Sequence, residues 1–157
     1  MKTESEDAVF RGARLPSLLY LDTSALLKLY IPEADSEELN RALQGRRDLI
    51  VSDLAVTEAV SALARRRREG RVSDESVHRL HRLVLVHLRS GVFLRSEMNQ
   101  EAHRDAEGIL LRVREVPLRA ADALHLALAA AAGAKSVITF DRRLAEGARR
   151  VGLSAFL

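Results

Sequence analysis

The stretch Leu18-Leu19-Tyr20-Leu21-Asp22-Thr23-Ser24 decides the fold, because four apolar residues run straight into an acid and two hydroxyls. A short, wholly apolar run predicts a strand that is buried on both faces of a sheet. Residues 24–31 predict a helix, which Pro32 stops. The chain therefore opens with a strand that leads directly into a helix, and polar groups lie at the junction.

The same alternation continues to the end of the chain. Further strands are predicted at residues 48–51, 92–94, 136–140 and 153–157, and the helices between them at residues 37–44, 53–69, 73–89, 99–114, 119–132 and 142–151. Asp35 or Ser36 is expected to cap the first of these helices, and Ser52 or Asp53 the second. Repeated strand–helix alternation predicts an α/β sandwich, in which helices cover both faces of a parallel sheet.

Composition narrows the class of protein. The length of 157 residues indicates one domain, and 47% hydrophobic with 30% charged residues is typical of a globular protein. There are no cysteines, which excludes disulfides, thiolate nucleophiles and cysteine metal sites. The first 17 residues carry no apolar core of a signal peptide, and the apolar stretch 120–134 is too short to span a bilayer, so a cytoplasmic location without a membrane anchor is expected.

The formal net charge is +3, and arginine accounts for 22 of the 25 basic residues. Two interpretations stay open. A GC-rich genome favours arginine codons, and guanidinium groups bind phosphate in a forked geometry. Composition alone does not separate them.

Four acids stand where the site of a parallel sheet is expected. Ligands bind outside the carboxyl ends of the strands, and Asp22 and Asp141 directly follow two predicted strands. Asp122 opens the alanine-rich helix, and Glu58 lies inside the helix after residues 48–51. A structural interpretation competes, because aspartates at helix N-termini commonly act as caps.

Glu58 is the hardest of the four to explain structurally. Leu54, Ala55, Ala59 and Ala62 surround it on one helix face, so its carboxylate needs an arginine, a proton or a metal ion as partner. Four converging anions require a compensating cation, and oxygen ligands select Mg²⁺ or Mn²⁺. Such a site predicts metal-assisted hydrolysis at phosphorus.

These residues carry a family resemblance. The segment Tyr20–Tyr30 resembles the first motif of PIN-domain ribonucleases, in particular the VapC toxins of type II toxin–antitoxin systems. Segments 54–60, 118–127 and 138–144 resemble the second, third and fourth motifs, with Glu58, Asp122 and Asp141 as their acids. The resemblance covers residues 18–157, and residues 1–17 form an N-terminal extension that is expected to be loosely ordered.

The resemblance implies a three-layer α/β/α sandwich and Mg²⁺- or Mn²⁺-dependent endonucleolytic cleavage of RNA. It implies that Asp22, Glu58, Asp122 and Asp141 are the catalytic and metal-binding residues. It also implies a small antitoxin as partner, and a homodimer or toxin–antitoxin hetero-oligomer as the assembly.

Several further residues have both a functional and a structural interpretation. The hydroxyls of Thr23, Ser24 and Thr139 can support the carboxylates or cap helices. Candidate contacts to substrate phosphate are Arg119, Arg142 and Arg143. His125 is interpreted as a core histidine rather than a metal ligand, and the run Arg65–Arg68 as a solvated helix end rather than an RNA contact.

Two other functions remain as alternatives. A catalytically silent PIN-like module would bind nucleic acid or a partner without cutting, although the presence of all four acids argues against it. A metal-dependent phosphatase of the aspartyl-phosphate type also places an aspartate at a strand end. Its motif carries a second aspartate two residues later, where this chain has Ser24.

Overall fold

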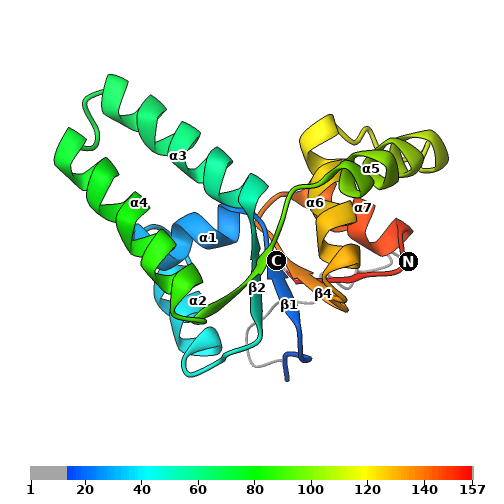
Figure 1. The fold of residues 1–157 in the computed structure, drawn as a ribbon, viewed down its shortest axis with the longest axis horizontal. Coiled ribbons are helices and arrows are strands. Elements are labelled where there is room, and N and C mark those ends of the chain that lie inside the picture. Colours follow the sequence, from blue (N-terminus) through cyan, green and yellow to red (C-terminus); the bar gives the residue numbers. More distant parts are fainter. Residues whose placement is uncertain (1–13, 157) are drawn as a thin grey trace, which may run out of the picture.

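A computed structural model describes residues 14–156 and contains one five-stranded sheet. All four strand pairs are parallel, and the strand order is β3-β2-β1-β4-β5 (Figure 1). The strands are β1 (Leu19–Leu21), β2 (Leu49–Ser52), β3 (Phe93–Ser96), β4 (Ser136–Ile138) and β5 (Ser154–Phe156). The predicted parallel sheet is confirmed.

Seven helices flank this sheet in the described residues, and each lies where a helix is predicted. They are α1 (Thr23–Tyr30), α2 (Ser36–Leu43), α3 (Asp53–Arg68), α4 (Asp74–Arg89), α5 (Gln100–Arg112), α6 (Ala120–Ala131) and α7 (Arg142–Arg150). Figure 1 shows α1 to α4 on one side of the sheet and α5 to α7 on the other. The expected three-layer α/β/α sandwich is therefore confirmed.

The first strand shows why the core has two halves. Successive side chains of a strand point to opposite faces. Leu19 and Leu21 pack into the hydrophobic cluster under α1 to α4, whereas Tyr20 joins the cluster under α5 to α7. All three are fully buried, as expected for a strand covered on both faces.

Two local predictions are wrong in detail. The strand predicted at residues 136–140 ends at Ile138. Thr139 N–H still donates to the Phe156 carbonyl, but Phe140 N–H donates to Ser24 Oγ and Asp141 N–H to Thr139 Oγ1. Asp35 precedes α2 with a left-handed φ of 68°, and its side chain makes no capping hydrogen bond. Ser36 Oγ instead accepts from Glu33 N–H and donates to the Ile31 carbonyl.

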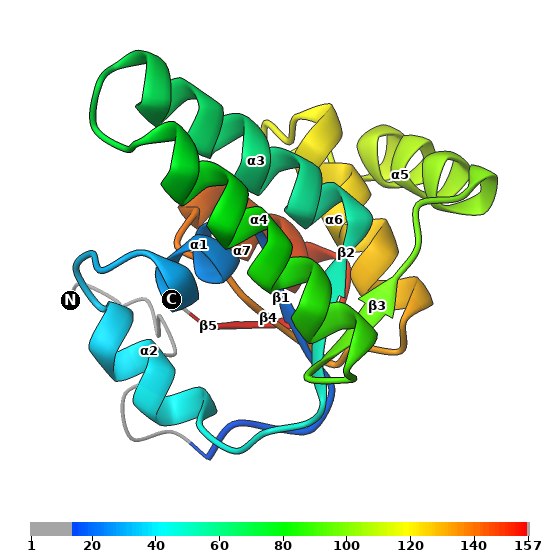
Figure 2. The same ribbon diagram turned by 60° about the vertical axis from the view of Figure 1, so that its left-hand side comes forward.

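The strand order indicates at which edge of the sheet a functional site is expected. Connections leave β1 toward β2 on one side, while β4 lies on its other side, so the order reverses between β1 and β4 (Figure 2). Ligands of open α/β sheets bind at such a reversal, outside the carboxyl ends of the strands. Asp22 N–H donates to the Ile138 carbonyl at 3.3 Å, which joins the ends of these two strands.

Residues 14–18 are tied to the opposite edge of the sheet. The Arg46 guanidinium donates to the Leu15 and Pro16 carbonyls, and Leu18 N–H donates to Asp48 Oδ2 at 3.0 Å. The prediction of a loosely ordered extension falls mainly on residues 1–13, which lie outside the described residues.

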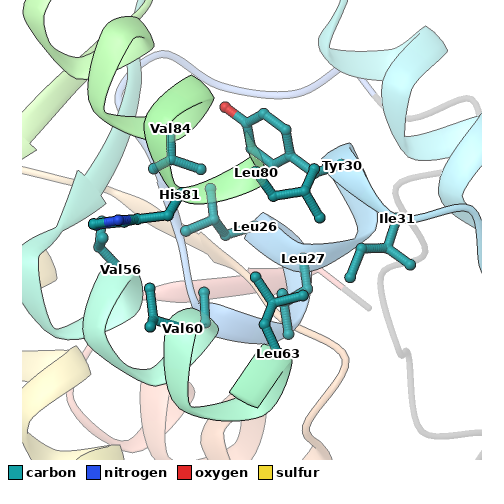
Figure 3. A pocket seen from close by; sticks show the side chains of 11 residues that line it. Leu26, Leu27, Tyr30, Ile31, Val56, Val60, Leu63, Leu80, His81 and Val84 are labelled. Atoms are coloured by element: carbon teal, nitrogen blue, oxygen red, sulfur yellow. The ribbon is translucent and has the colours of Figure 1, made fainter. Parts of the chain in front are cut away.

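A small apolar pocket lies among α1, α3 and α4, where Leu26, Tyr30, Leu63 and Val84 face one another (Figure 3). It carries no carboxylate and lies on the other face of α3 from the acids described below. No helix within the described residues has the length and apolar character that crossing a membrane requires.

Candidate active site

All four predicted acids line a single pocket at the carboxyl edge of the sheet. Asp22 follows β1, Asp141 precedes α7, Asp122 lies in the first turn of α6, and Glu58 lies on α3. Three of them also serve a helix N-terminus, because Asp22 accepts from Ala25 N–H, Asp122 from Arg119 N–H and Asp141 from Arg143 N–H. The capping and site interpretations of these aspartates therefore hold together.

Asp22 is 4% exposed and is held by neutral donors. Ser24 Oγ donates to its two oxygens at 2.7 and 2.9 Å, and Thr139 Oγ1 donates to Oδ2 at 2.6 Å. Burial raises the pKa of this carboxyl above its ordinary value, and the nearby His125 together with these hydrogen bonds offsets only part of that effect. The ionised Asp22 is thus a costly buried anion that a nearby cation would stabilise.

Asp122 is also buried, at 6% exposure, but it has a positive partner. Arg143 Nε donates to Asp122 Oδ2 at 2.6 Å, and Arg143 Nη2 lies 3.4 Å from Asp141 Oδ2. The two carboxylates raise the pKa of the guanidinium further, chiefly through the hydrogen bond with Asp122. Arg143 therefore balances the charge of these two acids, rather than standing free for substrate phosphate.

Glu58 finds its partner in His125. The imidazole Nε2 lies 2.7 Å from Glu58 Oε2, and Thr23 Oγ1 donates to the same oxygen at 2.6 Å. The hydrogen bond from His125 is the main reason that the pKa of Glu58 lies below its ordinary value. An imidazole and a hydroxyl therefore bind this carboxylate in the place of the arginine that was one of the partners predicted from the sequence.

His125 connects Glu58 to a hydrogen-bonded chain of buried side chains. Its Nδ1 lies 2.7 Å from the Tyr20 hydroxyl, which lies 2.6 Å from Ser52 Oγ. Because a carboxylate only accepts, His125 Nε2 donates to Glu58; in the neutral ring Nδ1 then accepts from Tyr20, and Ser52 donates to Tyr20. Burial raises the pKa of Tyr20, so this hydroxyl keeps its proton.

This chain is the part of the site that sequence interpretation missed. His125 was placed in the core, and it is indeed 4% exposed, yet it also lines the acid pocket. The available signal was its spacing from Asp122: residues three apart lie on neighbouring positions of one helix face. Nothing in the sequence marks Tyr20 or Ser52 as its partners.

The remaining candidates are divided by the structure. Arg119 and Arg143 line the pocket, whereas Arg142 is exposed and lies outside it. The hydroxyls of Thr23, Ser24 and Thr139 all donate to the acids. Arg65 and Arg68, which were interpreted as part of a solvated helix end, also line this pocket.

The donor set fits a hard divalent cation in chemistry. Four carboxylates and the hydroxyls of Thr23 and Ser24 line one pocket, Thr139 supports Asp22 from behind, and Asp22 has no cationic side chain in direct contact. Between residues 14 and 156, however, no group of three or more acids or histidines is arranged to hold a metal ion. The expected close cluster is thus not observed, because Arg143, His125 and the hydroxyls occupy the carboxylate oxygens. An ion would enter by replacing some of these contacts.

Comparison with known proteins identifies the family. The model of the PIN domain matches residues 19–150, a span that holds all four acids. This chain belongs to the PIN-domain family. This chain is 33% identical to Ribonuclease VapC46 of Mycobacterium tuberculosis over 138 residues, covering 87% of this chain and 94% of the relative. It is 30% identical to Ribonuclease VapC3 of Pyrobaculum aerophilum over 128 residues, covering 82% and 92%.

Solved structures agree on the fold of this PIN domain. VapC20 of Mycobacterium tuberculosis, described as a toxin that cleaves the sarcin–ricin loop, superposes with a TM-score of 0.64 at 18% identity, covering 82% of this chain and 93% of VapC20. FitAcB of Neisseria gonorrhoeae gives a TM-score of 0.65 at 20% identity, with coverages of 88% and 96%. The family resemblance seen in the sequence is confirmed, and with it the PIN fold.

Proposed function

We propose that this PIN domain is an endoribonuclease that hydrolyses RNA phosphodiester bonds with the help of Mg²⁺ or Mn²⁺. Two relatives that are at least 30% identical over most of both chains are named ribonucleases. The observation that carries the proposal is the pocket in which Asp22, Glu58, Asp122 and Asp141 meet. Among alternatives, the family match disfavours an aspartyl-phosphate phosphatase, and the intact set of acids disfavours a silent binding module.

We assign the four carboxylates different roles on the basis of their surroundings. Asp22 and Asp122 are the proposed direct ligands of the ion, with Glu58 and Asp141 binding directly or through water. When bound, a divalent cation supplies an activated water and stabilises charge on the phosphate oxygens. Asp22 contributes a buried anion whose direct hydrogen-bond donors are hydroxyls and one backbone N–H, all of them neutral.

Glu58 is suited to orient the attacking water. Both protein donors bind its Oε2, and Oε1 accepts no hydrogen bond from the described residues. The lowered pKa of Glu58 keeps its carboxylate ionised. Oε1 can therefore accept a hydrogen bond from water and hold that molecule in place. His125 and Thr23 fix the carboxylate, and Arg119 stands at the pocket edge as a candidate for substrate phosphate.

A cleavage assay with purified protein tests this proposal. Wild type with Mg²⁺ is expected to cut a structured RNA internally, and EDTA to stop the reaction. Asp22→Asn is expected to be inactive, while Asp105→Asn, an exposed acid on α5, retains full activity as a matched control. Equal rates for wild type and Asp22→Asn would refute the proposed site.

We also propose that the protein is the toxin of a toxin–antitoxin pair and acts in the cytoplasm. Its antitoxin would block the pocket, within a homodimeric or hetero-oligomeric assembly. Induced expression in a bacterial host is expected to arrest growth, and expression of Asp22→Asn is not. A small neighbouring gene whose product restores growth and co-purifies with the chain would support the pairing; harmless expression of the active enzyme would contradict it.

A further inference from the structure

The four consecutive arginines at the end of α3 do not form one equivalent group. Arg66 pairs with Glu33, and Arg67 Nη1 lies 2.6 Å from Asp74 Oδ1 at the start of α4. These two arginines are committed to ion pairs within the protein. Arg65 and Arg68 instead line the acid pocket.

The helix itself explains this division. Residues three, four and seven apart share one face of a helix, so Glu58, Arg65 and Arg68 form a single stripe along α3. Ser61 and Ala62 lie between them and also line the pocket. At 1.5 Å per residue, the two arginines stand about 10 and about 15 Å beyond Glu58 along the helix axis. The acid pocket thus continues as an arginine-lined surface on the same rigid element.

The charges on this stripe are largely uncompensated. Arg65 is 67% exposed, and its only ion pair with a residue that the structure describes is a 4.0 Å contact with Glu69. Within residues 14–156, Arg68 has neither a hydrogen bond nor an ion pair with another side chain. Arg66 and Arg67 on the same helix form ion pairs with acids of the protein. The guanidinium donors of Arg65 and Arg68 are instead available to an external anion.

We propose that Arg65 and Arg68 bind backbone phosphates of the RNA strand on one side of the cleaved bond. This inference rests on the proposed ribonuclease function and names the path of its substrate. A strand whose phosphate reaches the carboxylates must continue over the adjoining surface, and along α3 that surface offers guanidinium groups at the spacing of one helical turn. Because Glu58 lies on the same helix, the two contacts set the register of the strand relative to the pocket.

Phosphate binding is the favoured role because of what surrounds the stripe. An acidic peptide would bring carboxylates toward a pocket that already holds four of them, whereas RNA also supplies the phosphodiester bond that the proposed ribonuclease hydrolyses. Aromatic residues make up only 4% of the chain, and none lines this pocket, so stacking on bases is not a substitute. Backbone contacts give affinity without sequence preference.

The arginine run supplies its own matched control. We would measure RNA binding by fluorescence anisotropy with an end-labelled structured RNA, in an Asp22→Asn background that prevents cleavage, across a series of KCl concentrations. One variant carries Arg65→Gln and Arg68→Gln, and the other Arg66→Gln and Arg67→Gln. Both remove two positive charges from the same helix turn, and thermal melting would verify that both fold.

The first pair is expected to weaken RNA binding about tenfold at moderate salt and to lower the slope of log affinity against log salt by about 1.4, because each single-strand phosphate contact contributes about 0.7. The second pair is expected to leave affinity and slope close to those of the parent. In the active background, the first pair should raise KM and leave kcat unchanged.

Equal losses in the two pairs would overturn the proposal in favour of a general effect of net charge, and unchanged binding in the first pair would overturn it directly. Failure of the proposed function gives a different result. In that case the wild-type protein does not cut the RNA, while the two pairs of variants still report on binding. A parent protein that binds no RNA in this assay would overturn the proposal as well.

Discussion

Asp22 and Asp122 lie in the same pocket and are buried to nearly the same extent, at 4% and 6% exposure, but their charges are balanced differently. Asp22 receives hydrogen bonds from two hydroxyls and one backbone N–H. Asp122 receives the guanidinium of Arg143. One half of the pocket is therefore neutralised by the protein, and the other is not.

This difference predicts how each aspartate affects the free energy of unfolding. A buried anion with only neutral donors keeps much of its desolvation penalty, whereas an anion paired with a guanidinium recovers most of it. Asp22 should thus lower the stability of the metal-free protein, and Asp122 should raise it. Their removal is expected to abolish the same activity with opposite effects on folding.

The largest effect is expected for Asp22→Asn. Loss of a direct metal ligand should reduce the rate of RNA cleavage at least about a hundredfold. The amide still accepts from Ala25 N–H and Ser24, but it carries no charge, so the melting temperature without metal should be unchanged or higher. Calorimetry beside a cleavage assay measures both. A marked loss of stability would show that the protein already balances this charge.

Asp122→Asn should lose activity as well, but with a lower free energy of unfolding. Arg143 would then face a neutral amide at position 122 beside its 3.4 Å contact with Asp141, and the loss of charge on this hydrogen bond is expected to cost about 2 kcal/mol. Urea titration without metal measures this cost. If the two asparagine variants were equally stable, the division of the pocket into two halves would be wrong.

The sequence predicted the fold well because its signals were local. Wholly apolar runs marked the strands, and Ser52 caps α3 as its position suggested. One error involves a distant group. Phe140, predicted to lie in the strand at residues 136–140, instead donates its N–H to the hydroxyl of Ser24, which is more than a hundred residues away in the chain.

The acids of the site were predictable, and their partners were not. Asp22 and Asp141 follow from strand ends at a reversal of strand order. The contact between Glu58 and His125 depends on how α3 crosses α6, which a single sequence does not encode in any local pattern. The same holds for the arginine run: nothing in the sequence distinguishes Arg65 and Arg68, which line the pocket, from Arg66 and Arg67, which do not.

A smaller effect is expected at the buried chain behind Glu58. Tyr20→Phe removes the hydroxyl between Ser52 and His125, and His125→Gln keeps an N–H donor for Glu58 while breaking the link to Tyr20. Because these groups position Glu58 and do not touch RNA, kcat should fall about tenfold with KM unchanged.

His125→Ala tests the same positioning role more severely, since it leaves Glu58 with Thr23 alone. It should lose more activity than His125→Gln, and a substitution of the exposed His103 serves as the control. A rise in KM, or equal activity in the alanine and glutamine variants, would remove His125 from the site and return it to the core.

The smallest effect is expected for an arginine–aspartate pair outside the pocket. Comparing this pair with Arg143 and Asp122 tests whether the loss of activity expected for Asp122→Asn depends on the position of Asp122 in the pocket. Arg46 donates through Nε and Nη2 to the two oxygens of Asp48 at 2.9 and 2.7 Å, and this hydrogen bonding lowers the pKa of Asp48. A lowered pKa in the folded state contributes stability above the ordinary aspartate value of about 3.9, and that contribution is lost as the pH falls through the lower, folded-state value.

Asp48→Asn should therefore cost about 1 kcal/mol at neutral pH, since the pair is partly exposed, and nothing in strong acid. Its cleavage activity should equal that of the wild type, because Asp48 precedes β2 at the edge of the sheet opposite the acid pocket. Urea titrations at neutral and acid pH, with a cleavage assay at neutral pH, measure both expectations. A stability difference that persists in acid would mean that Asp48 acts through shape and not charge. Lost activity would mean that the two edges of the sheet are coupled, and Asp122 could then no longer be distinguished by its place in the pocket.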